Sequence, residues 1–169
     1  RGETIVKTKY NRACECETVT VVAAGDALDS YAEALTVLPT DVVLEETRYV
    51  RNPKNGWVHG VLHTTRGSGG CAAGGPMTDP DQLTIEADGG FTVGSGYGQN
   101  GQGVTGSAPN RMSVSTVWRD ALGRAVWTTE LGDPAYDEGS FSFSPSSVFS
   151  NEDNGRVSAT HFGALGRAD

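Results

Sequence analysis

Residues 112–131 read MSVSTVWRDALGRAVWTTEL and carry the clearest structural pattern in the chain. Two runs rich in β-branched and aromatic residues, 112–118 and 125–131, are typical of β-strands. The intervening Asp120-Ala121-Leu122-Gly123-Arg124 fits a type I turn in which Gly123 takes the left-handed bulge position. The pattern therefore predicts an antiparallel hairpin.

The register of this hairpin decides which face each tryptophan occupies. If pairing continues from the turn without interruption, Trp118 lies opposite Val126 and Val117 lies opposite Trp127. Opposed residues share a face and neighbours along a strand alternate, so Trp118 and Trp127 are predicted on opposite faces of the sheet. One face can form the core, and we expect the other to be covered by a helix, a second sheet or another subunit.

Two more hairpins are predicted on the N-terminal side of this one. Residues 42–51 and 57–65 flank Asn52-Pro53-Lys54-Asn55-Gly56, where proline presets one turn dihedral and Asn-Gly tolerates positive φ. A smaller hairpin is expected over residues 83–93, with Asp88-Gly89-Gly90 at its turn.

One short helix is predicted near the N-terminus, after a strand at 18–22. It is expected to span about 26–38, because apolar residues recur there every three or four positions between Asp26, which can cap its start, and Pro39. Together these elements predict a mainly β fold, an antiparallel β-sandwich or jelly-roll-like domain.

The 169 residues, 37% of them hydrophobic, suit a single β-rich domain over 1–169 with glycine-rich loops at 67–80 and 94–106. Lys and Arg number 13 against 21 Asp and Glu, so the net charge of -8 supplies no basic field for nucleic acid or a membrane surface. The chain opens at Arg1 rather than Met and is rich in Gly, Ser and Thr. We expect a processed, secreted protein that is extracellular or particle-associated.

The three cysteines, Cys14, Cys16 and Cys71, are an odd number for an exported protein. We predict one disulfide between Cys71 and either Cys14 or Cys16, with the remaining thiol buried or paired between chains. A direct Cys14 to Cys16 bridge would be strained, and a fully reduced protein is the alternative.

No metal or cofactor is expected. His59 and His63 are predicted on one strand face, but about 13 Å apart, which is too far to hold one zinc ion. The G-x-G-x-x-G pattern at 96–101 is not followed by a sequence that can start a helix, so it predicts no nucleotide site. The carboxylates at 133–138 and 151–154 are interpreted as solvated turns, with calcium at one of them as the alternative.

No catalytic motif was recognised, because the chain has neither a G-x-S-x-G elbow nor an H-E-x-x-H pair, and we do not predict an enzyme.

An internal repeat points to the C-terminus. The sequence ALGRA at 121–125 recurs at 164–168, and Val114-Ser115 aligns with Val157-Ser158 at the same offset. The repeat predicts a strand from Val157 to Phe162 that enters a similar turn with no returning strand. Three interpretations remain open: a processing site in a longer repetitive polypeptide, a strand completed by a neighbouring chain, or a plain C-terminal tail.

The favoured function is a structural subunit that assembles with copies of itself into an extracellular filament, a tube or a virus-like particle, through strand-edge or terminal exchange. The residues assigned to assembly are Val157, Ser158, Ala159, Thr160, His161, Phe162, Trp118 and Trp127.

The alternative function is a secreted β-sandwich module that binds a carbohydrate or another ligand. Its predicted contact surface combines Trp57, Tyr97 and the loop at 94–106, since aromatic residues on loops suit the faces of sugars.

Overall fold

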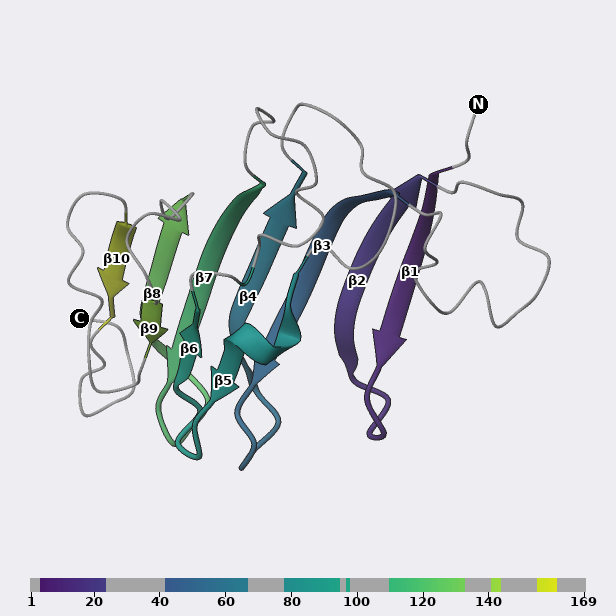
Figure 1. Ribbon diagram of the computed structural model, residues 1–169. Coiled ribbons are helices and arrows are strands. Elements are labelled where there is room, and N and C mark those ends of the chain that lie inside the picture. Colours follow the sequence, from purple (N-terminus) through teal and green to yellow (C-terminus); the bar gives the residue numbers. More distant parts are fainter. Residues whose placement is uncertain are drawn as a thin grey trace.

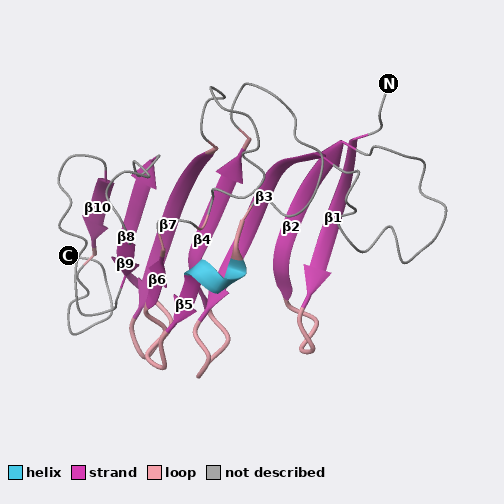
Figure 2. Ribbon diagram, viewed as in Figure 1, coloured by secondary structure: helices cyan, strands magenta, loops and turns pink. Residues whose placement is uncertain are grey.

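The computed structural model describes residues 4–23, 42–66, 78–94, 97, 110–132, 141–143 and 155–160. Within them the protein is mainly β, with two antiparallel sheets, which confirms the predicted fold class (Figures 1 and 2). The predicted helix at 26–38 lies outside the described residues. No helix among the described residues is long and apolar enough to cross a membrane.

The larger sheet has seven strands in the order β1 (Thr4–Tyr10), β2 (Cys16–Ala23), β3 (Val42–Arg51), β4 (Val58–Thr65), β7 (Arg111–Arg119), β8 (Ala125–Gly132) and β10 (Gly155–Ala159). The smaller sheet has the order β5 (Leu83–Ile85), β6 (Phe91–Val93) and β9 (Phe141–Phe143), and the 3-10 helix η1 (Pro80–Gln82) precedes β5. Figure 1 shows β1 and β10 at opposite ends of the larger sheet.

The three predicted hairpins are confirmed, and a glycine with positive φ lies in each turn. Gly56 has φ 73° between β3 and β4, Gly89 has φ 92° between β5 and β6, and Gly123 has φ 82° between β7 and β8. In each turn the amide of this glycine donates to a carbonyl three or four residues earlier; the Gly123 N–H, for example, donates to the Asp120 carbonyl at 2.9 Å. Turn chemistry thus positions six of the strands.

The predicted register of the β7–β8 hairpin is wrong by one residue. The strands pair Arg119 with Ala125 but Trp118 with Trp127, so a β-bulge at Val126 interrupts the ladder. Directly paired residues share a face, and both tryptophans therefore lie on the same face of the sheet. The two tryptophans therefore do not place apolar area on both faces of the sheet.

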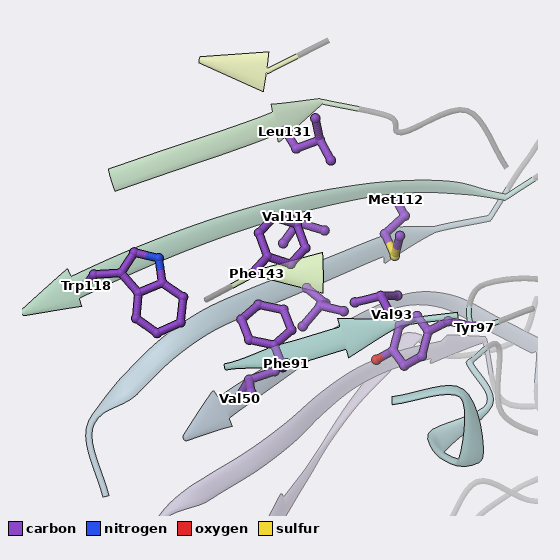
Figure 3. Packing of buried hydrophobic residues seen from close by; sticks show 10 residues of the cluster. Val50, Phe91, Val93, Tyr97, Met112, Val114, Trp118, Leu131 and Phe143 are labelled. Atoms are coloured by element: carbon purple, nitrogen blue, oxygen red, sulfur yellow. The ribbon is translucent and has the colours of Figure 1, made fainter. Parts of the chain in front are cut away.

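The main core lies between the two sheets. The smaller sheet covers β4, β7 and β8 on one face of the larger sheet, here called the inner face, and the opposite face is called the outer face. The core residues are Val50, Leu62, Phe91, Val93, Tyr97, Met112, Val114, Trp118, Leu131 and Phe143 (Figure 3). Gly60 lets the sheets approach closely, because a Cβ there would lie 2.5 Å from the Phe91 ring.

The sequence analysis did not predict two strands, β1 and β9. The exposure of residues along β1 is irregular, and its most buried residue is Lys7. Its sequence therefore lacks the alternation of apolar and polar residues that indicates a strand. β9 has only three residues, which is too short for a periodic pattern.

Candidate functional site

The two histidines occupy opposite faces of β4, so the prediction that they share a face is wrong. A register shift beside Val50 and Arg51 turns His59 inward, where its ring packs edge-on against Trp118 with centroids 4.7 Å apart. Burial lowers the pKa of His59 below 6.5, and the nearby Arg119 adds to this, whereas Gly89 and Asp88 oppose it. His63 lies on the outer face, within 3.0 Å of the Thr47 hydroxyl.

The predicted disulfide has no support in the structure. Cys14 and Cys16 both carry free thiols, Cys14 exposed and Cys16 partly buried, and Cys71 lies outside the described residues. Cys14 occupies the tight turn between β1 and β2 with φ 60°, and its amide donates to the Asn11 carbonyl.

Tyr97 does not lie on the surface, which removes it from the predicted ligand-contact surface. It is only 1% exposed, and Figure 3 shows it at the opposite end of the labelled core from Trp118. Trp57 is 37% exposed, but the rest of the predicted surface, except for Gly94, lies outside the described residues. The acidic segments 133–138 and 151–154 also lie outside them.

The C-terminal assembly segment forms the outermost strand at one end of the larger sheet. β10 comprises Gly155–Ala159, somewhat earlier than the predicted 157–162, and His161 and Phe162 lie outside the described residues. Among the described strands β10 pairs only with β8, from Gly155 opposite Leu131 to Ala159 opposite Trp127. The Thr160 N–H continues this ladder by donating to the carbonyl of the bulged Val126 at 2.9 Å.

The direction of the Thr160 N–H shows which backbone groups of β10 face away from β8. In an antiparallel strand the N–H and C=O of one residue point to the same side, and successive residues alternate. Thr160 and Ser158 therefore point toward β8, whereas Ala159 and Val157 direct their backbone N–H and C=O groups to the free side. This row of backbone groups is called the β10 edge.

The strand at the opposite end of the sheet, β1, differs from β10 in carrying two lysines. β1 pairs only with β2 among the described strands, and it carries Lys7 on the inner face at 5% exposure. Its second lysine, Lys9, forms an exposed ion pair with Glu17 at 2.9 Å. Inward-pointing and flanking charges on an outer strand are features that oppose pairing with another chain.

The inner face also contains a buried polar region that the sequence analysis missed. Two cross-strand rows meet there: Lys7, Thr20, Glu46 and Thr64 are paired in one row, and Thr18, Arg48 and Leu62 in the next. Thr78 and Tyr97 lie against these rows. The polar cluster is defined as Thr18, Glu46, Arg48, Thr64, Thr78 and Tyr97.

Glu46 is the acceptor of the polar cluster. It is 4% exposed, accepts a short hydrogen bond from the Thr78 hydroxyl, and has the Arg48 guanidinium 3.7 Å away. Burial raises the pKa of Tyr97 to about 12, and the Arg48 cation offsets only part of this shift. Tyr97 is therefore a neutral hydroxyl at every physiological pH.

Several donors of the polar cluster have no hydrogen-bond partner among the described residues. They are Thr18 Oγ1, Thr64 Oγ1, Arg48 Nε and Tyr97 Oη. The Tyr97 hydroxyl lies beside the Thr78 and Arg48 side chains, and both lower its pKa against the larger effect of burial. Most buried polar atoms in folded proteins are paired, so a group of unpaired donors on one sheet face marks this region as a candidate binding site.

A sequence signal for the polar cluster did exist. Glu46 and Arg48 alternate with Thr47 in the middle of a strand between two apolar ends, and Thr18 and Thr20 alternate in the same way on the preceding strand. A strand face with this composition predicts a polar patch within a sheet, but Tyr97 and Thr78 come from loops whose position only the fold reveals.

The described residues contain no group of three or more His, Cys, Asp or Glu side chains placed to hold a metal ion. Comparison of the chain with protein-family models, with curated protein sequences and with solved structures found no match.

Proposed function

We propose that the protein is a structural subunit that associates with copies of itself by pairing the β10 edge of one molecule with the β10 edge of another. The observation that carries this proposal is the row of outward backbone groups at Val157 and Ala159, for which the described residues provide no partner strand. An unpaired strand edge is a ready template for another strand, and main-chain hydrogen bonds then supply the affinity.

Pairing of two β10 edges gives a symmetric contact. Two identical strands that run antiparallel are related by a twofold axis, so each copy offers the same edge and the contact closes on itself. The larger sheets of the two molecules then join into one continuous sheet. This arrangement is a dimer, which we propose as the building unit of any larger assembly.

Growth of the dimer into a filament or a particle would need a second contact. The β1 edge is the other end of the sheet, but Lys7 and Lys9 disfavour strand pairing there. We therefore place the first contact at β10. The proposed setting remains extracellular or particle-associated, on the basis of the composition of the chain.

The proposal is tested by Ala159→Pro. Proline removes the N–H that points to the free side and puts its ring where the partner strand would pair, while the bonds from β10 to β8 are kept. Ser158→Lys is the matched control, because Ser158 is exposed and its backbone faces β8. Light scattering coupled to size exclusion, from low micromolar to near-millimolar concentration, should show a dimer for the wild type and the control and a monomer for Ala159→Pro.

A second measurement does not depend on how well the proline variant folds. In the wild type, the Ala159 amide should become protected from hydrogen exchange as concentration rises, whereas the protection of Ser158 should not change. A wild type that remains monomeric throughout, or an Ala159→Pro variant that still dimerises, would overturn the proposal.

A further inference from the structure

We infer that His59 makes the contact between the two sheets sensitive to acid: the β5–β6 turn stays packed against the larger sheet while the His59 ring is neutral, and protonation of the ring weakens that packing. This packing of the turn residues Asp88 and Gly89 on Asn52 and His59 is called the His59 contact. The inference concerns the inner face of β4 and does not depend on pairing at the β10 edge.

The first argument is the position of the His59 ring, which lies between the β5–β6 turn and a tryptophan of the main core. The residue is 6% exposed, and its ring packs edge-on against Trp118 on β7 with centroids 4.7 Å apart. The ring also meets Gly89 in the turn, where a Cβ would lie 2.8 Å from His59 Nδ1. The imidazole is thus enclosed between the turn of the smaller sheet and a strand of the larger one.

The second argument is how closely the turn packs at this point. Asn52, between β3 and β4, is 7% exposed, and its Nδ2 donates to the Asp88 carbonyl at 3.2 Å. A Cβ on Gly89, which has φ 92°, would lie 2.6 Å from the same Nδ2. An imidazolium at His59 would therefore lose most of its hydration unless the turn moved away.

The third argument is the charge around the ring. Burial has the largest effect and lowers the pKa of His59, and the Arg119 cation on β7 lowers it as well. The Gly89 backbone and the Asp88 carboxylate act in the opposite direction, and the effect of Asp88 is the smallest of the four. Asp88 Oδ1 also accepts a hydrogen bond from the Gly90 amide at 2.8 Å. Protonation is therefore unfavourable while the turn remains in place.

The pH dependence of the contact follows by linkage. A lowered pKa means that the opened form, in which the ring is solvated, binds a proton more readily than the closed form. Above pH 6.5 the His59 contact has its full stability. Between pH 6.5 and the lower pKa of the closed form, each unit of pH raises the opening equilibrium constant by up to about tenfold. Opening would uncover Phe91, which follows the turn and is 1% exposed in the closed form.

The first experiment measures the pKa of His59 in the full-length wild type by NMR titration of its ring protons. We expect a value below 6.5, because burial outweighs the groups that favour the charged ring. A value of 6.5 or higher, as a cation–π contact with Trp118 would produce, would overturn the inference.

The second experiment measures opening of the contact by native-state hydrogen exchange, corrected for the intrinsic rates, from neutral to mildly acidic pH. The reporter is the Glu86 amide, which donates to the Gly90 carbonyl at 2.7 Å and closes the β5–β6 turn. Its protection requires the turn to be held in place, since an isolated two-stranded hairpin is marginally stable at best. His59→Phe keeps a ring against Trp118 but cannot be protonated. His63→Phe is the matched control on the outer face of the same strand.

The opening constant of the Glu86 amide should rise as the pH falls below 6.5 in the wild type and in His63→Phe, by up to about tenfold per unit of pH. In His59→Phe this rise should be absent, because no group at position 59 takes up a proton. The same pH dependence in His59→Phe as in the wild type would show that another group controls the opening.

Discussion

At the scale of single residues, the contact between the two sheets depends on the missing side chain of Gly60. A Cβ at this position would lie 2.5 Å and 2.7 Å from two atoms of the Phe91 ring and 3.3 Å from Val50 Cβ. Phe91 has little room to move away, because it is 1% exposed and stacks on Phe143 with ring centroids 4.9 Å apart. The two sheets can pack this closely only with glycine at position 60.

We predict that Gly60→Ala lowers the free energy of unfolding by about 1–3 kcal/mol, the range for overpacking a close-packed core. Urea denaturation followed by tryptophan fluorescence measures the change. Gly132→Ala is the control, since a Cβ there meets nothing within 4 Å, and its effect should remain within about 0.5 kcal/mol. Equal changes in the free energy of unfolding for the two substitutions would show that the close approach to Phe91 does not destabilise Gly60→Ala.

At the scale of elements, the β7–β8 turn is held by one carboxylate. Asp120 Oδ1 accepts hydrogen bonds from the Leu122 and Arg124 amides at 2.9 Å and 3.0 Å, and Oδ2 accepts from Arg124 Nε at 2.7 Å. The bond from the Arg124 side chain holds the pKa of Asp120 below 3.8, with further help from the two backbone amides. This lowered pKa makes the stability of the hairpin dependent on pH.

The sign of that dependence follows from the lowered pKa. The ionised Asp120 stabilises the folded protein above pH 3.8, and this contribution is lost as the pH falls through the lower pKa of the folded state. At neutral pH we predict that Asp120→Ala is less stable than Asp120→Asn, which keeps the Oδ1 acceptor, and that both are less stable than the wild type.

Chemical denaturation at a series of pH values from neutral to acidic tests this order. The difference in the free energy of unfolding between the wild type and Asp120→Asn should shrink as the pH falls below 3.8. The wild-type carboxyl then becomes protonated and is uncharged, like the asparagine amide. A difference that is the same at every pH would mean that the charge of Asp120 does not stabilise the turn.

The same hairpin shows what local sequence can and cannot predict about an element. Asp120 and Gly123 define the turn by their own chemistry, and the turn was predicted correctly. The bulge at Val126 was not predicted. The Val126 carbonyl accepts a hydrogen bond from Thr160, which directly follows β10 and lies more than thirty residues away in the chain. A contact of that kind has no local signal, and it reversed the predicted face of Trp127.

At the scale of the whole molecule, the larger sheet has two unlike halves on its inner face. The strands β4, β7 and β8 lie beneath the smaller sheet and contribute Leu62, Val114 and Leu131 to the main core. The strands β2 and β3 carry three members of the polar cluster, and a second, smaller apolar cluster joins β1 to β3 through Ile5, Val22 and Val43. The same difference bears on what the sequence predicted. Hairpins with apolar strands were found, whereas β1 was missed because its burial is irregular, and the polar cluster was missed because Thr78 and Tyr97 join it from loops.

The two halves should therefore open independently. Local opening needs less free energy where fewer apolar contacts are broken, so amides of β1 should exchange through a partial opening and amides of β7 only through global unfolding. Native-state hydrogen exchange in low urea, resolved by residue, measures both free energies. Lys7 on β1 and Val114 on β7 are suitable reporters, because each is paired with a residue of the neighbouring strand. Equal opening free energies at these two positions would mean that the polar half is as firmly held as the apolar core. The fold would then behave as one cooperative unit in spite of the unequal distribution of its apolar contacts.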